Sequence, residues 1–100
     1  MKYYHFTQKN NILNILKNKK LLNNGTGIYV CDNVEDSLKF INLYIDVGSI
    51  QKENTIIIEF ESDNNFTESF DHNSELLNGA KAFVCWEDVN IKNVKINSLY

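Results

Sequence analysis

Residues 55–61 read Thr-Ile-Ile-Ile-Glu-Phe-Glu, and this stretch decides the fold because it is the most strongly β-prone segment of the chain. β-Branched and aromatic side chains pack well on a pleated sheet, so the segment predicts a strand. Its period of two places Ile56, Ile58 and Phe60 on one face, toward a core. The two glutamates share the opposite face, which is typical of the solvent side of an antiparallel sheet.

A strand followed by a helix is expected at the N-terminus. Tyr3-Tyr4-His5-Phe6 is a short aromatic strand, and Thr7 is positioned to cap a helix that runs to about Lys19. The apolar positions that form one face of this helix are Ile12, Leu13, Ile15 and Leu16.

A second strand and a second helix follow the clearest turn in the chain, at residues 23–27. Residues 28–31 are apolar and predict a buried strand. Asp32 and Glu35 have the spacing of a capping box, and the helix they begin is expected to end at Gly48. Its helically spaced apolar residues are Val34, Leu38, Ile41 and Ile45.

The second half of the chain predicts strands without helices. An irregular stretch at 66–77 precedes a strand over 80–86, a turn over 87–92 and a closing strand over 93–96. Helices early and strands late favour an α+β fold with a small twisted, mainly antiparallel sheet and two helices in the N-terminal half. The length predicts one domain, residues 1–100.

Composition narrows the class of protein. A hydrophobic content of 43% fits a folded globule. No apolar run approaches the roughly 20 residues of a membrane span, and the first residues do not form a signal peptide, so a cytoplasmic location is expected. Cys31 and Cys85 lie in apolar runs without metal-ligand spacing, which predicts buried reduced thiols and no metal site.

The net charge of −3 hides an uneven distribution of charge along the chain. Five of the ten basic residues precede the first acid, Asp32, and every one of the ten is a lysine. This cationic first third could take a pyrophosphate or a nucleic-acid backbone, or form a solvated helix. The lack of arginine disfavours a dedicated nucleic-acid site. Such a site would use Lys9, Lys17, Lys19 and Lys20.

Three places carry candidate ligand-binding side chains. His5 and Thr7 end the first strand beside an asparagine-rich helix start, although a lone histidine is also a common structural residue. Tyr29 follows a glycine turn and could stack on a flat ring or pack in the core. Asp71 and His72 form a polar pair in the irregular region, as a binding loop or a plain Asx turn.

These segments together resemble a known fold. Tyr4-His5-Phe6-Thr7, the apolar pattern of 12–16, Gly27-Ile28-Tyr29-Val30 and the helix start at 32–40 are similar to the first half of the ADP-ribosyltransferase fold. The similarity is closest to the small bacterial and phage branch that includes DarT-like DNA transferases and RNA 2′-phosphotransferases. The later segments that fit the closing strands of that fold are 56–61, 80–84 and 87–94.

The resemblance implies NAD as a ligand or substrate. In such enzymes a histidine at the end of the first strand bonds the ribose, a role that falls here to His5. The resemblance gives Thr7 or the neighbouring backbone to the nicotinamide amide, and gives Tyr29 to stacking on the nicotinamide ring. Asp71 and His72 remain candidates for further ligand contacts.

One departure from the family pattern bears on catalysis. Active members begin the strand corresponding to residues 80–86 with a glutamate, but Lys81 and Ala82 stand here. A lysine beside the developing cation of the reaction opposes catalysis. A replacement carboxylate would have to come from elsewhere, and the candidates are Glu59, Glu61, Glu68, Asp71 and Glu87.

Three functions follow as hypotheses. The first is a non-catalytic module that binds a nucleotide-like ligand or a protein partner, as an inhibitor of a host defence system carried by a phage or mobile element. The second is an active NAD-dependent ADP-ribosyltransferase or NAD glycohydrolase that uses a displaced carboxylate. The third is a structural protein-interaction module, which could form a homodimer through an exposed strand edge.

Overall fold

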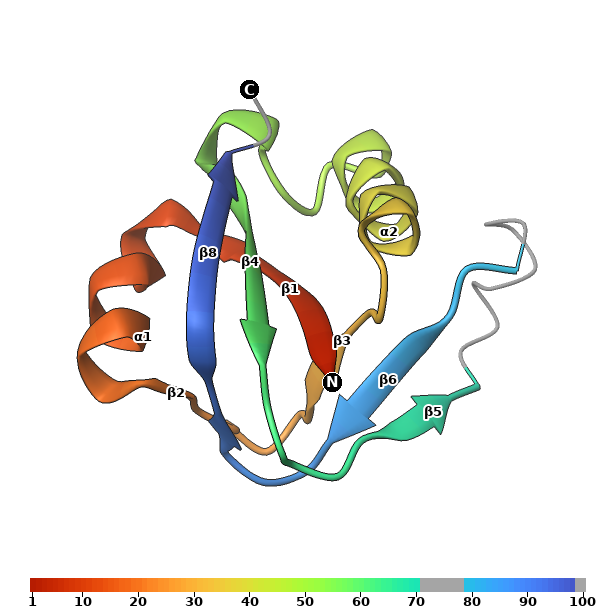
Figure 1. Ribbon diagram of the computed structural model, residues 1–100. Coiled ribbons are helices and arrows are strands. Elements are labelled where there is room, and N and C mark those ends of the chain that lie inside the picture. The colour runs from red at the N-terminus through yellow and green to blue at the C-terminus, as the bar shows by residue number, and fades with distance from the viewer. Residues whose placement is uncertain (71–78, 99–100) are drawn as a thin grey trace.

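The structure, a computed structural model, describes residues 1–70 and 79–98 of the chain. Figure 1 shows the arrangement of its helices and strands. In chain order these are β1 (Lys2–Gln8), the 3₁₀ turn η1 (Lys9–Asn11), α1 (Ile12–Asn18), β2 (Lys20–Leu21), β3 (Ile28–Val30), α2 (Val34–Asp46), the 3₁₀ turn η2 (Lys52–Asn54), β4 (Thr55–Glu61), β5 (Thr67–Ser69), β6 (Ala82–Cys85), β7 (Val89–Asn90) and β8 (Lys92–Ser98).

The strands form two three-stranded sheets, in the orders β1-β4-β8 and β3-β6-β5, and β2 pairs with β7. Every described pairing is antiparallel. The two larger sheets touch through one isolated bridge, between Tyr4 of β1 and Cys31 just after β3. The predicted α+β class is confirmed, with two α-helices in the N-terminal half and antiparallel sheets.

Strand β4 lies at the centre of the first sheet and has the bounds that the sequence predicts. Ile56, Ile58 and Phe60 belong to the main core, which β3, β6 and part of α1 complete. The expectation that the opposite face of β4 meets solvent is wrong at Ile57, which is also buried. Its register partner Phe6 packs on α2, so the second helix covers that face.

Helix α1 begins later than the sequence predicts, because β1 is longer. β1 pairs with β4 as far as Gln8 opposite Thr55, and this ladder keeps Thr7 extended. Thr7 therefore does not cap the helix; instead Asn11 precedes α1 and its side-chain amide donates to Thr7 Oγ1 at 3.0 Å. The helix ends before Lys19, which has a left-handed φ of 53°.

Helix α2 is confirmed with a different cap. Asn33 precedes the helix, and its side-chain oxygen accepts from the backbone N–H of Asp36 at 2.8 Å, whereas the sequence pattern predicts a cap by Asp32 with Glu35. At the C-terminal end β6 is shorter and β8 longer than expected, and the two residues of β7 lie within the predicted turn.

We expect Ile58→Ala to lower the free energy of unfolding by about 2–5 kcal/mol, because it opens a cavity in the core beneath the central strand. Leu13→Ala is the matched control, since the Leu13 side chain is 80% exposed on α1. Its effect should stay within about 0.5 kcal/mol. Denaturant unfolding followed by circular dichroism measures both, and equal losses would contradict this placement of the core.

Candidate functional site

The candidate site lies where the two larger sheets part. At the bridge, Tyr4 N–H donates to the Cys31 carbonyl at 2.8 Å and Cys31 N–H donates to the Tyr4 carbonyl at 2.9 Å. In a continuing antiparallel ladder the next such pair would be Phe6 and Tyr29. That pair does not form; the His5 side chain bonds the Tyr29 carbonyl instead, at 2.7 Å from its Nδ1. His5 thus fills the opening between β1 and β3.

This hydrogen bond fixes which ring nitrogen of His5 carries a proton. A carbonyl oxygen only accepts, so Nδ1 carries the proton. Burial lowers the pKa of the imidazole below its usual value, and the bond to the Tyr29 carbonyl opposes that shift only in part. The ring is therefore neutral at pH 7, and its Nε2 is a hydrogen-bond acceptor.

A groove of about 580 Å³ lies on the α2 side of this seam. We call it the α2 groove. His5 lines it together with aromatic side chains from β1, β3 and α2: Tyr4, Phe6, Tyr29, Phe40 and Tyr44. Tyr29 is 45% exposed, so a ligand in the groove could contact its ring. Flat apolar groups suit such a lining.

Ser37 gives the α2 groove an unpaired polar group. It lies in the first turn of α2, is only 1% exposed and lines the groove. Its hydroxyl makes no hydrogen bond to any described residue that meets the usual geometry. An unsatisfied buried hydroxyl costs stability, which a ligand that bonds it would recover.

The thiol of Cys31, which interacts with Ser37, stays protonated at neutral pH. Burial raises the pKa of Cys31 to about 11, although its interaction with Ser37 acts in the opposite direction. Cys31 and Cys85 are both buried and free of disulfide bonds, as the sequence predicts. Cys31 therefore belongs to the floor of the groove as an apolar side chain.

A second groove, of about 360 Å³, adjoins the first. We call it the α1 groove. His5 and Gly27 line both grooves, which places the two on either side of the seam. Side-chain amides dominate the lining of the α1 groove, with one ammonium from Lys20 and no carboxylate among the described lining residues. The amides belong to Asn11, Asn14, Asn18 and Asn24.

Gly27 requires the conformation that only glycine tolerates well. Its φ is +82°, and a Cβ at this position would lie 2.8 Å from Cγ2 of Val84. Asn23 holds the turn, because its side-chain oxygen accepts from the N–H groups of Gly25 and Gly27 at 3.0 and 3.1 Å. Its amide also donates to the Trp86 carbonyl. The boundary between the grooves is therefore a braced turn.

The residues predicted for the site divide into three groups. His5 and Tyr29 converge on the α2 groove, while Thr7 lines the α1 groove and accepts the hydrogen bond from Asn11. Asp71 and His72 lie outside the described residues. All four lysines predicted to contact nucleic acid are exposed, but only Lys20 lines the α1 groove, and neither groove is lined by Lys9, Lys17 or Lys19.

The candidate carboxylates among the described residues do not line the α2 groove. Glu59 comes nearest by contact, because Tyr4, which lines the groove, donates its hydroxyl to Glu59 at 3.1 Å. Glu59 also pairs with Lys2 and Lys95 at 3.8 and 3.9 Å. Glu61 accepts a hydrogen bond from Asn93.

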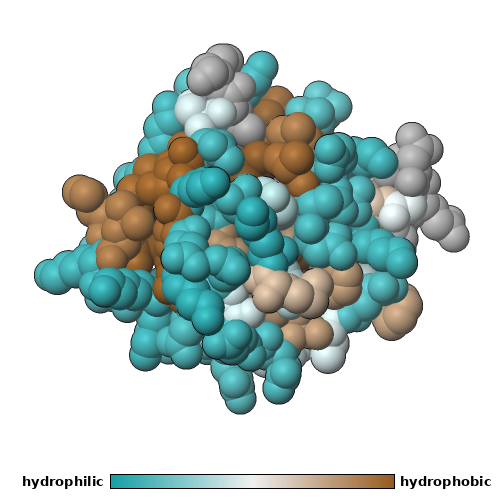
Figure 2. Space-filling model, in the orientation of Figure 1, coloured by the Kyte–Doolittle hydropathy of each residue, from teal (hydrophilic) through white to brown (hydrophobic). Residues whose placement is uncertain are grey.

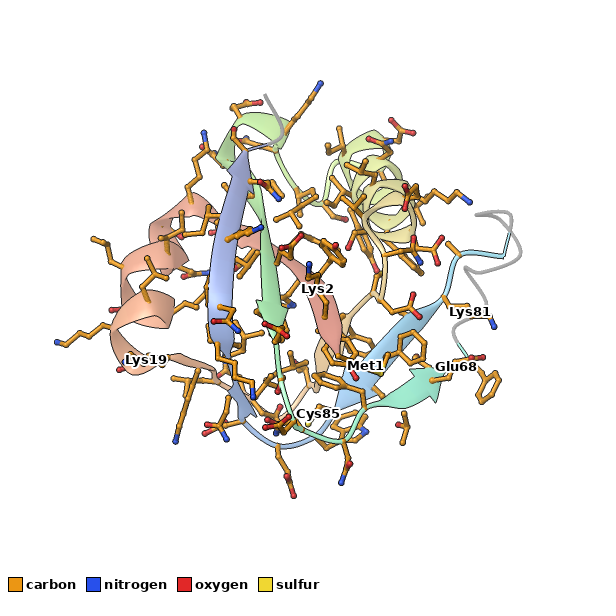
Figure 3. All side chains as sticks on the ribbon, in the orientation of Figure 1. Met1, Lys2, Lys19, Glu68, Lys81 and Cys85 are labelled. Atoms are coloured by element: carbon orange, nitrogen blue, oxygen red, sulfur yellow. The ribbon has the colours of Figure 1, made fainter. Side chains whose placement is uncertain are left out.

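Glu68 points away from the groove. It faces Phe83 across the β5-β6 ladder, whereas Tyr29 faces the adjacent residue Val84, so Glu68 and Tyr29 lie on opposite faces of their sheet. Figure 3 shows Glu68 and Lys81 together at β5 and β6, where they form an ion pair of 3.8 Å. Among the described residues no cluster of three possible metal ligands occurs.

Sequence reasoning missed Ser37 and Phe40. Both lie on the side of α2 that faces β1, where Phe40 and Tyr44 pack on Phe6. The signal in the sequence was a serine that shares helical spacing with buried apolar residues, since Ser37 stands four residues before Ile41. A small polar residue on the apolar face of a helix indicates either that another element packs closely against the helix there or that the side chain binds a ligand.

Comparison with known proteins identifies no relative: no family model matches the chain, and no curated protein or solved structure is significantly similar to it. None of the helices formed by residues 1–70 and 79–98 has the length and apolar character that crossing a membrane requires.

We expect the imidazole of His5 to titrate below the ordinary histidine pKa of about 6.5, because burial favours its neutral form. The unfolded chain then binds more protons than the folded chain between the two pKa values. The contribution of His5 to the free energy of unfolding is therefore largest above about pH 6.5. It is lost as the pH falls through the pKa of His5 in the folded chain.

Denaturant unfolding at a series of pH values tests this linkage. The variant His5→Gln should lose the part of the pH dependence that His5 contributes, whereas His72→Gln should retain it. NMR titration of the His5 ring gives the pKa directly, and a value at or above about 6.5 would contradict the expected direction.

Proposed function

We propose that the chain is a non-catalytic ADP-ribosyltransferase-like module that binds a nucleotide-like ligand across the seam between β1 and β3. The observation that supports this function is the pair of adjoining grooves that share His5, one lined by aromatic rings and one by side-chain amides. A nucleotide with a flat ring, a ribose and a charged, polar remainder matches this order of surfaces.

The flat ring of the ligand belongs in the α2 groove. Tyr29 and Phe40 offer aromatic faces to it. The Ser37 hydroxyl lines the groove, and apart from its interaction with the Cys31 thiol it makes no hydrogen bond of the usual geometry to a described residue, so it can bond an amide on the ring. Backbone groups alternate in direction along an antiparallel strand, so those of Phe6 point toward the same side as the bridged groups of Tyr4. A nicotinamide ring with its carboxamide fits these groups.

The ribose and the polar remainder of the ligand belong at the seam and in the α1 groove. The neutral His5 ring accepts a hydrogen bond at Nε2, and a ribose hydroxyl is a suitable donor. The amides of the α1 groove donate and accept, and Lys20 adds a positive charge. Because no described lining residue there is acidic, the groove tolerates phosphate.

Binding without turnover follows from the charges around the α2 groove. Cleavage of the nicotinamide bond develops positive charge on the ribose, and negative charge nearby is needed to stabilise it. The described residues that line the groove include no carboxylate. Lys81 stands where the resemblance expects a glutamate. Its ammonium pairs with Glu68, and its backbone N–H donates to the Asp36 carboxylate at 3.2 Å.

The biological role that we propose comes from the resemblance alone. A small binding module of this kind, carried by a phage or mobile element, would inhibit a host defence system by sequestering a nucleotide or by occupying a host protein. The alternative, an active ADP-ribosyltransferase or NAD glycohydrolase, has one supporting contact: the hydrogen bond from Tyr4 in the groove to Glu59.

We expect NAD or ADP-ribose to raise the melting temperature of the protein and to remain intact. Tyr29→Ala should weaken binding by about tenfold, since stacking of a base on an aromatic ring contributes roughly 1–3 kcal/mol. Tyr29→Phe should bind as the wild type does. Phe70→Ala is the matched control, because Phe70 is an exposed aromatic residue outside both grooves.

Thermal shift, isothermal titration calorimetry and chromatography of the nucleotide after incubation measure these effects. The panel includes NAD, ADP-ribose, a cyclic dinucleotide and short DNA. If the wild type releases nicotinamide from NAD and Glu59→Gln does not, the chain is an enzyme and the non-catalytic proposal is wrong. If no nucleotide changes the melting temperature, the nucleotide-binding proposal is wrong, and binding of a protein partner remains as the hypothesis.

Ser37→Ala separates stability from binding. Removing an unpaired buried hydroxyl should leave the free energy of unfolding unchanged or raise it by up to about 1 kcal/mol. The same substitution should weaken NAD binding by roughly five- to tenfold, because a hydrogen bond to the ligand is lost. Ser49→Ala, an exposed serine of the same groove, is the control. Lower stability with unchanged affinity would make Ser37 a structural residue only.

A further inference from the structure

A second surface lies away from the seam, at the outer edge of β8. β8 is the last strand of the β1-β4-β8 sheet, and no described strand pairs with its outer edge. All of its residues except Val94 are exposed. From Val94 to Asn97 the outer edge therefore presents backbone N–H and C=O groups with no strand partner among the described residues, and an extended segment of another chain can bond them.

Apolar side chains lie beside this edge. Leu13 and Leu16 of α1 are 80% and 42% exposed, and Ile96 of β8 is exposed as well. Leu16 and Val94 line an apolar groove of about 290 Å³ between α1 and β8. Figure 2 shows brown, hydrophobic side chains gathered on the side of the view where α1 lies. Exposed apolar residues that cluster in this way mark an interaction surface.

The two faces of β8 differ in chemistry. Lys95 stands opposite Glu59 and Ile96 opposite Ile58, so the lysine and the isoleucine lie on opposite faces. Lys92 stands opposite Glu61 and shares the face of Lys95. A strand added to this edge would therefore meet lysines on one face and apolar side chains on the other.

Every charged residue of α1 and β8 is a lysine. Lys17 and Lys19 near the apolar patch form no ion pair with a described residue, and Lys19 is labelled beside the end of α1 in Figure 3. Lys92 pairs with Asp63 at 3.1 Å, and Lys95 pairs with Glu59 at 3.9 Å; both lysine side chains are exposed. Surface pairs of this kind contribute little, so the lysines remain available to a partner.

Charge also bears on which strand can be added. A second copy of β8 would place its lysines near Lys92 and Lys95, and like charges across strands destabilise a pairing. Opposite charges stabilise it, which favours an acidic segment. Asn93 has a positive φ of 53°, which breaks the regular edge near its start and leaves the stretch from Val94 onward for pairing.

We propose that the outer edge of β8, together with Leu13 and Leu16, docks an extended segment of a partner protein in which acidic and apolar residues alternate. The segment adds as a strand beside β8. Its acidic side chains meet Lys92 and Lys95, and its apolar side chains meet Ile96 and the leucines of α1. This surface is separate from both grooves, so the docking does not depend on the nucleotide.

The test uses the full chain and a twelve-residue peptide of alternating glutamate and valine, titrated in NMR. We expect shift changes along β8 and slower hydrogen exchange at alternate amides from Val94 to Asn97. The double variant Lys92→Gln and Lys95→Gln should bind the peptide roughly two- to thirtyfold more weakly than the wild type. Lys39→Gln with Lys81→Gln is the control with the same change of charge, and should bind as the wild type does.

Three results would overturn the proposal. One is no shift change in β8 at millimolar peptide. Another is equal binding of a lysine–valine peptide, which would exclude charge recognition. The third is binding of anionic vesicles or short DNA through the same lysines without protection of the β8 amides. NAD binding measured on the same variants distinguishes failure here from failure of the nucleotide site.

Discussion

The structure depends on a ladder that stops after one bridge. Tyr4 and Cys31 join the two larger sheets by two backbone hydrogen bonds, and the His5 side chain then takes the carbonyl that the next pair would use. The sheets remain attached and still part around an imidazole. Both grooves border the place where a side chain replaces a backbone donor, and both include His5 in their lining.

Unfavourable local features gather around the same seam. Ser37 is buried without a hydrogen bond to a described residue, and burial lowers the pKa of His5. Gly27 has a positive φ close to Val84. The buried hydroxyl opposes stability, the burial of His5 does so only when the imidazole is protonated, and Gly27 supplies a backbone conformation that other residues rarely adopt. They lie at the opening where we propose that a ligand binds, and such a ligand could bond the hydroxyl and the imidazole together.

Local sequence patterns predict the central strand and the second helix because their residues alone carry the signal: β4 has the expected bounds, and α2 follows its apolar spacing. The start of α1 was missed because the pairing of Gln8 with Thr55 holds Thr7 in the strand, and that pairing is distant in sequence. Ser37 was missed for a related reason. Its unpaired state depends on what α2 packs against, which no local pattern contains.

The asparagines and leucines of α1 show how one short helix serves two surfaces. Asn11, Asn14 and Asn18 line the α1 groove, whereas Leu16 lines the apolar groove beside β8. No residue of α1 is buried, so its sequence is not constrained by the core alone. The sequence of the lysine-rich first third predicts one cationic face, but the structure divides it: Lys20 lines the α1 groove at the seam, and Lys19 lines the apolar groove beside β8. A charge excess along the chain thus becomes two separate surfaces once the helix is placed.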